Sequence, residues 1–242
     1  MDITSLTNQQ VKKVTSLHTK KYRDAYKEFF IEGPKLFEEA RKYNQEIVDV
    51  FYCPEIIDYD FDIKVNTVTK EVIAKMTDTN TPQGIVAVCK IPTYELAKRE
   101  KLLFLDRVQD PGNVGTIIRT ADAFGFDAVL LSDGCADIYS PKVVRATMGS
   151  IFHFPIIQKV SLNKLKSFNN KIYSSSLESN SDFLGDFEIE KSFVLVIGNE
   201  GQGISQEVKN ITDKFVKINM EGNAESLNAS IAAGILMYEF TK

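Results

Sequence analysis

The chain has 242 residues, of which 43% are hydrophobic and 26% are charged, and its formal net charge at pH 7 is −4. This length suffices for one large or two small domains with an enclosed site. The longest apolar runs fall well short of the roughly 18 residues that a membrane-spanning helix needs, and residues 1–13 are too polar for a secretory leader. We therefore expect a cytoplasmic protein.

The cysteines and histidines argue against a metal site. Cys53, Cys89 and Cys135 lie far apart, and His18 and His153 are the two histidines of the chain. This number and spacing match neither a disulfide framework nor a metal-ligand motif. We expect reduced thiols and no bound metal.

The first ninety residues have the pattern of a small α/β unit. Proline at a first helical position opens the second predicted helix, and valine and isoleucine are frequent in the predicted strands. The predicted elements are helices at residues 8–19 and 34–43 and strands at residues 46–53 and 84–90. The polar stretch 91–101 is the predicted linker, so we expect domains at residues 1–95 and 96–242.

From residue 102 onward, short apolar runs alternate with helical segments. Such runs are typical of buried parallel strands in an α/β domain. The predicted strands are residues 102–105, 128–131, 172–177, 193–198 and 215–220, and the predicted helices are residues 116–124, a segment opened by Ser140-Pro141, and residues 226–240.

Residues 1–27 form a basic segment in an acidic chain. They contain six basic and two acidic side chains, a net charge of +4. Such a segment suits contact with phosphates, although an ordinary solvated helix face is the alternative. The candidate RNA contacts are Lys12, Lys13, Lys20, Lys21 and Arg23.

The first strand of the second domain ends in a loop that contains Pro111, Gly112, Asn113 and Gly115. The glycine spacing matches neither a dinucleotide fingerprint nor a P-loop. In the following helix, Ile117, Ile118, Ala121 and Phe124 are predicted to face the core. Arg119 lies off this stripe and should lean back over residues 113–115, where a bound anion would stabilise it. The alternative is a surface salt bridge of Arg119 with Asp122 or Asp106.

Two later loops also follow predicted strands. Residues 198–203 form a glycine-rich turn in which Glu200 would be a ready partner for Arg119. In the third loop, Ser226 and Asn228 are candidate helix caps or ligands. A stripe of Leu227, Ile231, Ile235 and Tyr238 is predicted to be buried. The small residues Ala229, Ala232, Ala233 and Gly234 would admit another helix, either internally or in a dimer.

Together, the three loops are more informative than any one of them. The segments DPGNVGTIIRTADAFG, LVIGNEGQGIS and INMEGNAESLNASIAAGILMYE resemble the three motifs of the SpoU/TrmH family of RNA ribose 2′-O-methyltransferases, within the SPOUT superfamily. The N-terminal part resembles the ribosomal-protein-L30e-like substrate-binding domain of members that act on ribosomal RNA. The resemblance implies an α/β protein with a trefoil-knotted, mostly parallel C-terminal domain, S-adenosylmethionine as methyl donor, and a homodimer formed through the knotted domain.

The resemblance also implies roles for individual residues. Asn113, Arg119, Glu200, Ser226 and Asn228 match the catalytic positions, and Gly198, Ile218 and Leu227 match the positions that cradle the cofactor. Asn219 departs from the proline of many members. Because a guanidinium keeps its proton at physiological pH, we expect Arg119 to grip a phosphate and stabilise the developing alkoxide rather than act as a base.

The expected function is methyl transfer to a ribose 2′-hydroxyl of structured RNA, with 23S ribosomal RNA favoured. The alternatives are a transfer-RNA methyltransferase and a catalytically silent RNA-binding protein of the same fold. A nucleotide-dependent oxidoreductase would need a phosphate fingerprint and an acidic ribose ligand, which the chain contains only in inexact form.

Overall fold

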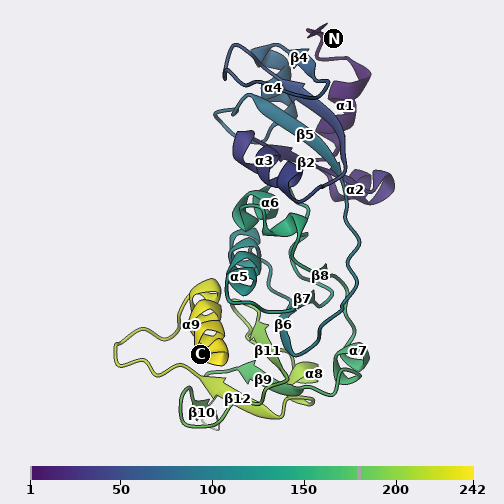
Figure 1. The fold of residues 1–242 in the computed structure, drawn as a ribbon. Helices are drawn as coiled ribbons and strands as arrows, with labels where there is room; N and C mark the ends of the chain where they lie inside the picture. Colours follow the sequence, from purple (N-terminus) through teal and green to yellow (C-terminus); the bar gives the residue numbers. More distant parts are fainter. Residues whose placement is uncertain (1, 179–180) are drawn as a thin grey trace. The chain divides into compact units, whose positions relative to one another are not determined.

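The computed structural model describes residues 2–178 and 181–242, which form two compact units (Figure 1). The first unit consists of residues 1–93 and 137–153, and the second of residues 94–136 and 154–242. Residues 137–153 therefore cluster with the N-terminal unit, although they follow the first strands and the first helix of the second unit in sequence.

The first unit is built on a five-stranded mixed sheet in the order β1-β4-β3-β5-β2. Helices α1 and α4 pack over a core that includes Val11, Val72 and Val88. The elements are β1 (Asp2–Ile3), α1 (Gln9–Ser16), α2 (Lys20–Tyr26), β2 (Glu28–Glu32), α3 (Pro34–Lys42), β3 (Ile47–Tyr52), β4 (Asn66–Val68), α4 (Lys70–Met76), β5 (Ile85–Lys90), α6 (Pro141–Thr147) and the 3₁₀ helix η1 (Ser150–Phe152).

Aromatic and ionic contacts hold residues 137–153 within the first unit. The ring of Phe29, on β2, lies 5.0 Å from that of Tyr139 and 6.4 Å from that of Phe152. Arg23 Nη2, on α2, lies 2.6 Å from Asp137 Oδ2, and the Arg23 side chain is almost fully buried. A buried guanidinium needs such a partner, because an unpaired buried charge is costly.

The second unit is built on a seven-stranded sheet in the order β10-β12-β9-β11-β6-β7-β8. All pairings between its described strands are parallel, as the apolar strand sequences predicted. The elements are β6 (Lys101–Asp106), α5 (Pro111–Ala123), β7 (Ala128–Leu131), β8 (Ile156–Ile157), α7 (Leu162–Lys166), β9 (Lys171–Ser175), β10 (Asp182–Phe183), β11 (Phe193–Gly198), α8 (Gln206–Lys209), β12 (Lys214–Lys217) and α9 (Ala229–Thr241).

Both faces of the central strands in this sheet are buried. Phe104 and Val196 contribute to a core cluster that also contains Leu165 of α7 and Val208 of α8. Helices α5 and α9 pack against each other, and α9 also contacts β11. The carboxyl ends of these strands therefore emerge from a fixed apolar layer, which can hold the loops beyond them in place.

Helix α5 begins earlier than the sequence predicted. It starts at Pro111, not at residue 116, because the Asp110 side chain caps the helix by accepting a hydrogen bond from the Asn113 N–H at 2.8 Å. Asn113 and Gly115 are therefore helical and buried, not part of an open turn. The prediction of Ile117, Ile118 and Ala121 as core residues is confirmed.

The predicted buried stripe of α9 is wrong. Leu227 is 36% exposed, Ile231 56%, Ile235 37% and Tyr238 52%. The helix instead buries Ala233, Leu236, Met237 and Phe240, and the Phe240 ring packs edge-on against those of Tyr173 and Phe193. Because α9 is apolar on both sides, periodicity alone could not identify the face that meets the sheet.

In the residues that the structure describes, no helix combines the length and apolar character required for crossing a membrane.

Candidate active site

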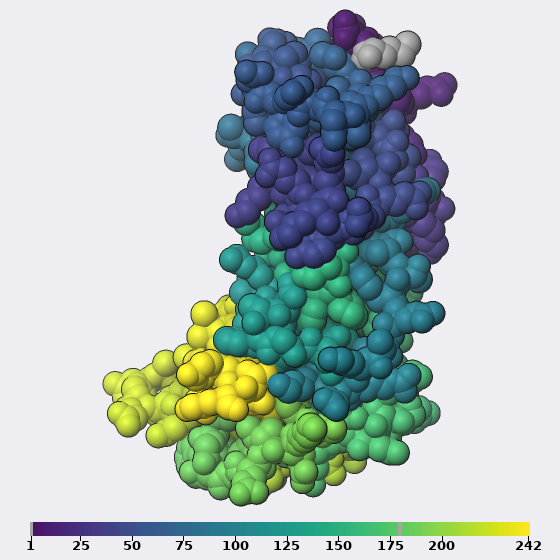
Figure 2. Space-filling model, viewed as in Figure 1, coloured from purple at the N-terminus to yellow at the C-terminus, as the bar shows by residue number. Residues whose placement is uncertain are grey.

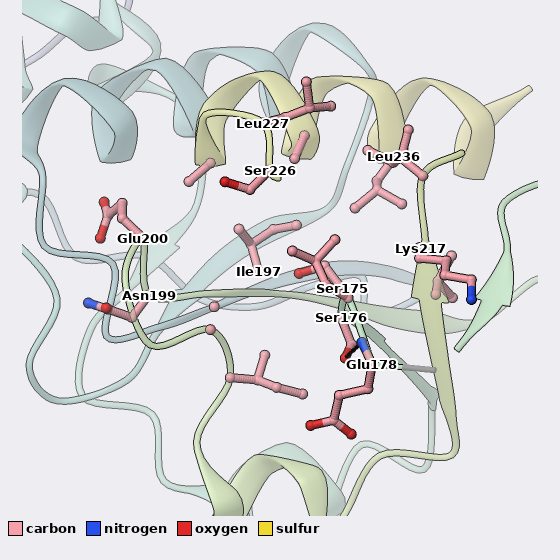
Figure 3. A pocket seen from close by; sticks show the side chains of 18 of the residues that line it. Ser175, Ser176, Glu178, Ile197, Asn199, Glu200, Lys217, Ser226, Leu227 and Leu236 are labelled. Atoms are coloured by element: carbon pink, nitrogen blue, oxygen red, sulfur yellow. Dashed lines mark hydrogen bonds between the residues drawn. The ribbon is translucent and has the colours of Figure 1, made fainter. Parts of the chain in front are cut away.

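A cavity of about 520 Å³ opens at the carboxyl ends of β9, β11 and β12, three neighbouring parallel strands (Figure 3). Its walls come from residues 175–178, 197–204, 216–218 and 220, which lie at or just beyond the ends of these strands. Ser226 and Leu227, which precede α9, and residues of α9 itself complete the lining. Open α/β sheets bind ligands at this edge, and the volume suits a small organic molecule.

The cavity has an apolar wall and a few polar groups. Ile197, Ile218 and Leu236 provide apolar surface, and Ser175, Ser176, Glu178 and Lys217 provide hydrogen-bonding groups. Ser226 and Leu236 lie on one side of the cavity and Glu178 on the other (Figure 3). Lys209 Nζ pairs with the Glu178 carboxylate. This lining suits a ligand with an apolar body and polar substituents.

Strand β11 runs into a tight turn, and its last residue, Gly198, has no room for a side chain. A Cβ atom on Gly198 would lie 2.4 Å from the backbone of Gly203 and Ile204. Asn199 and Gly203 exchange two backbone hydrogen bonds of 2.9 Å. The Asn199 side chain accepts from the amides of residues 201 and 202 and donates to the Arg107 carbonyl at 2.8 Å. The turn is therefore a rigid edge of the cavity.

Glu200 contacts the start of α5 through both carboxylate oxygens. It accepts hydrogen bonds from Asn113 Nδ2 at 3.0 Å and from the amides of Gln109 and Asp110 at 3.1 Å. Partial burial raises the pKa of Glu200, but these hydrogen bonds lower it more, so the pKa lies below its ordinary value. The predicted partnership of Glu200 with Arg119 is wrong, since the oxygens of Glu200 bind the beginning of the helix instead.

Asn228 completes a network that joins the three sequence motifs. Its Nδ2 donates to Asn113 Oδ1 at 3.0 Å, while its Oδ1 caps α9 by accepting from the amides of Ser230 and Ile231. Glu200, Asn113 and Asn228 thus fix the turn after β11, the start of α5 and the start of α9 relative to one another. We call these three residues the motif network.

Arg119 stands apart from this network. Its side chain is exposed on α5, and within the described part of the chain it forms neither a hydrogen bond nor an ion pair. Asp106, one predicted partner, pairs with Arg107 Nε at 3.3 Å. Arg119 therefore presents a guanidinium that is available for an anion.

The predicted site residues divide into three groups. Gly198, Glu200, Ile218, Ser226 and Leu227 line the cavity. Asn113 binds Glu200 directly, and Asn228 binds Asn113. Arg119 neither lines the cavity nor belongs to this network. Ser175, Ser176 and Glu178 also line the cavity but were not predicted, because the sequence marks them only by a serine run at the end of an apolar strand.

The basic residues of the first unit do not all remain available for RNA. Lys12, Lys20 and Lys21 are exposed, whereas Lys13 Nζ pairs with Glu28 at 2.7 Å. The prediction of Arg23 as an RNA contact is not supported, because this side chain is buried against Asp137 and the Leu17 carbonyl.

Family models match both parts of the chain. Residues 100–238 match the SpoU rRNA Methylase family, and residues 8–87 match the MRM3-like substrate binding domain. The chain is 39% identical to the 23S rRNA (guanosine(2553)-2′-O)-methyltransferase RlmP of Bacillus subtilis, over 98% of this chain and 97% of that protein.

Solved structures of methyltransferases are also similar to this chain. The AdoMet-bound rRNA methyltransferase from Sinorhizobium meliloti is 32% identical, with a TM-score of 0.87 over 99% of this chain and 96% of that one. The SpoU methyltransferase AviRb from Streptomyces viridochromogenes, in complex with the cofactor AdoMet, is 25% identical, with a TM-score of 0.85 over 97% of each chain.

The cavity fits the cofactor of these relatives. S-adenosylmethionine has a flat adenine, a polar ribose and a charged amino-acid group. An apolar wall, a turn in which Gly198 allows close backbone approach, and the nearby Glu178 and Lys217 suit that mixture. The chain therefore belongs to the SpoU rRNA methylase family and is an S-adenosylmethionine-dependent RNA 2′-O-methyltransferase with an α/β fold.

Proposed function

We propose that the protein methylates a ribose 2′-hydroxyl of 23S ribosomal RNA. The observation that carries this proposal is that Glu200 both lines the cavity and holds Asn113 and, through it, Asn228. Residues of all three sequence motifs therefore meet at the edge of the cavity. Similarity to RlmP over nearly the full length supports 23S RNA over transfer RNA as the substrate.

Gly198, Ile218 and Leu227 hold the cofactor in this proposal, chiefly through main-chain groups and apolar contact. S-adenosylmethionine, when bound, supplies a methyl group on a positively charged sulfur. The apolar wall around it excludes water. This exclusion strengthens each electrostatic contact near the reacting atoms.

The chain's own part in the reaction is to position and to stabilise. Arg119 binds a phosphate of the RNA next to the target ribose and stabilises negative charge that develops on the 2′-oxygen. The motif network and Ser226 keep the surrounding loops in one arrangement, so that nucleophile and methyl group meet in line. The hydroxyl proton leaves to the RNA phosphate or to water.

The first domain, residues 1–95, presents the RNA. Its similarity to a substrate-binding domain supports this role. The exposed Lys12, Lys20 and Lys21 contact phosphates. With such a substrate, we expect the protein to act in the cytoplasm.

A homodimer formed through the second unit also belongs to this proposal. Ile231, Ile235 and Tyr238 form an exposed apolar face on α9, next to the segment between β12 and α9, which stands out from the second unit (Figure 2). We call Ile231, Ile235 and Tyr238 the outer face of α9. An apolar face of this kind is stabilised when a second copy covers it. Gly234, in contrast, faces Thr120 of α5, so the small residues of α9 serve internal packing there.

The test is methyl transfer from radiolabelled S-adenosylmethionine to transcribed 23S RNA, with transcribed transfer RNA as the competing substrate. We expect incorporation into 23S RNA at a single 2′-hydroxyl, mapped by reverse transcription. Leu227→Arg should abolish both incorporation and calorimetric binding of S-adenosylmethionine. Leu6→Arg, at another exposed leucine of the chain, is the control and should leave both unchanged.

Each other outcome has a definite meaning. Incorporation into transfer RNA alone would overturn the choice of substrate. RNA binding without methyl transfer to either RNA would identify a catalytically silent binding protein. Unchanged cofactor binding by Leu227→Arg would move the cofactor site away from the cavity.

A further inference from the structure

Two tyrosines stand exposed on one face of α2 in the first unit. Tyr22 is 39% exposed and Tyr26 is 44% exposed. They are four residues apart and therefore share a helix face, and their ring centroids lie 6.2 Å apart with an interplanar angle of 23°. Tyrosine is intermediate between core and surface residues, so one exposed tyrosine would be ordinary, but two with stacked rings on one helix face form a joint aromatic surface. An exposed, stacked pair therefore requires an explanation.

Positive charge surrounds this pair. Lys21 Nζ lies 5.9 Å from the ring centroid of Tyr22, and Lys13 Nζ lies 5.8 Å from that of Tyr26. Lys20 and Lys27, close to the pair in sequence, are also exposed, and Asp24 is the exposed acidic residue between the two tyrosines. The chain carries a net charge of −4, so a basic region with two accessible aromatic rings is a distinctive local feature.

The helix that carries the tyrosines is anchored from beneath. Arg23 lies between the two tyrosines in sequence but is buried, and it binds Asp137 and the Leu17 carbonyl. Lys27, in the left-handed conformation with φ of 55°, ends the helix. The rings are therefore held on a fixed support, which lowers the entropic cost of binding a ligand to them.

We propose that Tyr22 and Tyr26 form a stacking platform for unpaired nucleobases of the RNA substrate, with the neighbouring lysines on the flanking phosphates. The proposal rests on the proposed function in that it takes ribosomal RNA as the substrate. Aromatic rings stack on bases that are splayed out of a helix, and a continuous duplex offers no such base face. The lysines supply attraction that does not depend on sequence.

The test uses a fluorescently labelled 23S RNA fragment centred on guanosine 2553, the nucleotide named for the Bacillus subtilis relative. A fully paired RNA duplex of equal length is the second probe. The variants are Tyr22→Ala/Tyr26→Ala, the matched Tyr22→Phe/Tyr26→Phe, and Lys20→Ala/Lys21→Ala. Because all of these side chains are exposed, unfolding midpoints should match the wild type.

We expect the alanine pair to weaken binding of the fragment by about tenfold or more, and the phenylalanine pair to bind within about twofold of the wild type. Binding of the duplex should change by less than about twofold in both. The lysine variant should weaken binding of both probes and reduce the dependence of affinity on salt. Equal affinity of the alanine pair and the wild type for the fragment would overturn the proposal, as would an equal loss for the duplex.

Methyl transfer separates this inference from the proposed function. At saturating RNA the alanine pair should keep the wild-type kcat and raise KM. If the wild type transferred no methyl group to any RNA, the proposed function would fail, while the comparison of the two probes would still decide whether the tyrosines bind unpaired bases.

Discussion

Asn228 Nδ2 donates a 3.0 Å hydrogen bond to Asn113 Oδ1, so one asparagine both caps α9 and fixes a side chain at the start of α5. The same Asn113 donates to Glu200. These two side-chain hydrogen bonds therefore connect three segments that are distant in sequence. A substitution at one of the three residues should therefore change the positions of the other two side chains.

Asn228→Ala should cost both stability and activity. It removes the cap of α9, for which we expect a loss of about 1 to 2 kcal/mol in the free energy of unfolding. Asn228→Asp keeps the capping oxygen but cannot donate to Asn113. It should retain most of the stability in urea denaturation while methyl transfer falls. Equal methyl-transfer rates for the aspartate variant and the wild type would mean that the bond to Asn113 is dispensable.

The hydrogen bonds to Glu200 predict a loss of stability in acid. The folded-state pKa of Glu200 lies below its ordinary value of 4.5. The stabilisation is therefore present above pH 4.5 and is lost as the pH falls through the folded-state pKa. In Glu200→Gln this contribution is absent, so the difference in unfolding free energy between wild type and variant should stay constant above pH 4.5 and narrow as the pH falls below it. Denaturation followed by circular dichroism measures this difference, and a difference that stayed constant below pH 4.5 as well would contradict the prediction.

Gly198→Ala should disrupt the turn at the edge of the cavity. The new Cβ would meet backbone atoms at 2.4 Å, which cannot move without opening the turn. We expect a loss of about 1 to 3 kcal/mol in unfolding free energy and weaker calorimetric binding of S-adenosylmethionine. Gly222→Ala is the matched control, because a Cβ there meets nothing within 4 Å. Similar behaviour of the two variants would argue against a tight turn at Gly198.

Arg119→Ala should separate activity from stability. The side chain is exposed and lacks a partner in the described residues, so unfolding free energy should stay within about 0.5 kcal/mol of the wild type. Methyl transfer should fall by about 100-fold or more if the guanidinium stabilises developing charge. Arg119→Lys keeps the charge but loses the planar fork, and it should recover part of the rate. Turnover near the wild-type value in the alanine variant would remove Arg119 from the mechanism.

The exposed outer face of α9 predicts that the protein is a homodimer in solution. A homodimer should have twice the 27.2 kDa mass of the chain in light scattering. Ile231→Arg introduces a charge in the centre of this face and should yield the single-chain mass. Ile63→Arg, at another exposed apolar residue, should not change the mass. A wild-type protein that scatters as a single chain would rule out the dimer.

Much of the second unit could be read from the sequence because its strands are buried on both faces. Such strands are continuous apolar runs, as in residues 193–198, and these predict a parallel sheet directly. The start of α5 was missed because proline and glycine in its first turn resemble a loop, while the Asp110 cap is a single side chain. The buried face of α9 depends on which apolar stripe meets the sheet, and this is a property of the tertiary structure.

The site was predicted as a set of positions but not as a set of contacts. Charge complementarity suggested that Glu200 pairs with Arg119, whereas the folded chain satisfies Glu200 with the Asn113 amide and two backbone N–H groups. The sequence does not reveal which backbone N–H groups at a helix start will bind a side chain, because every residue except proline carries one. Ser175 and Ser176 become cavity residues only through the pairing of β9 with β11.

The place of residues 137–153 limits how this protein can be divided and recombined. Phe29, Tyr139 and Phe152 share one aromatic cluster, and Arg23 is neutralised by Asp137. A chimera that joins residues 96–242 to a foreign N-terminal domain would expose this aromatic surface and leave Asp137 without its arginine. A domain exchange between this chain and a relative should therefore move residues 137–153 together with residues 1–93.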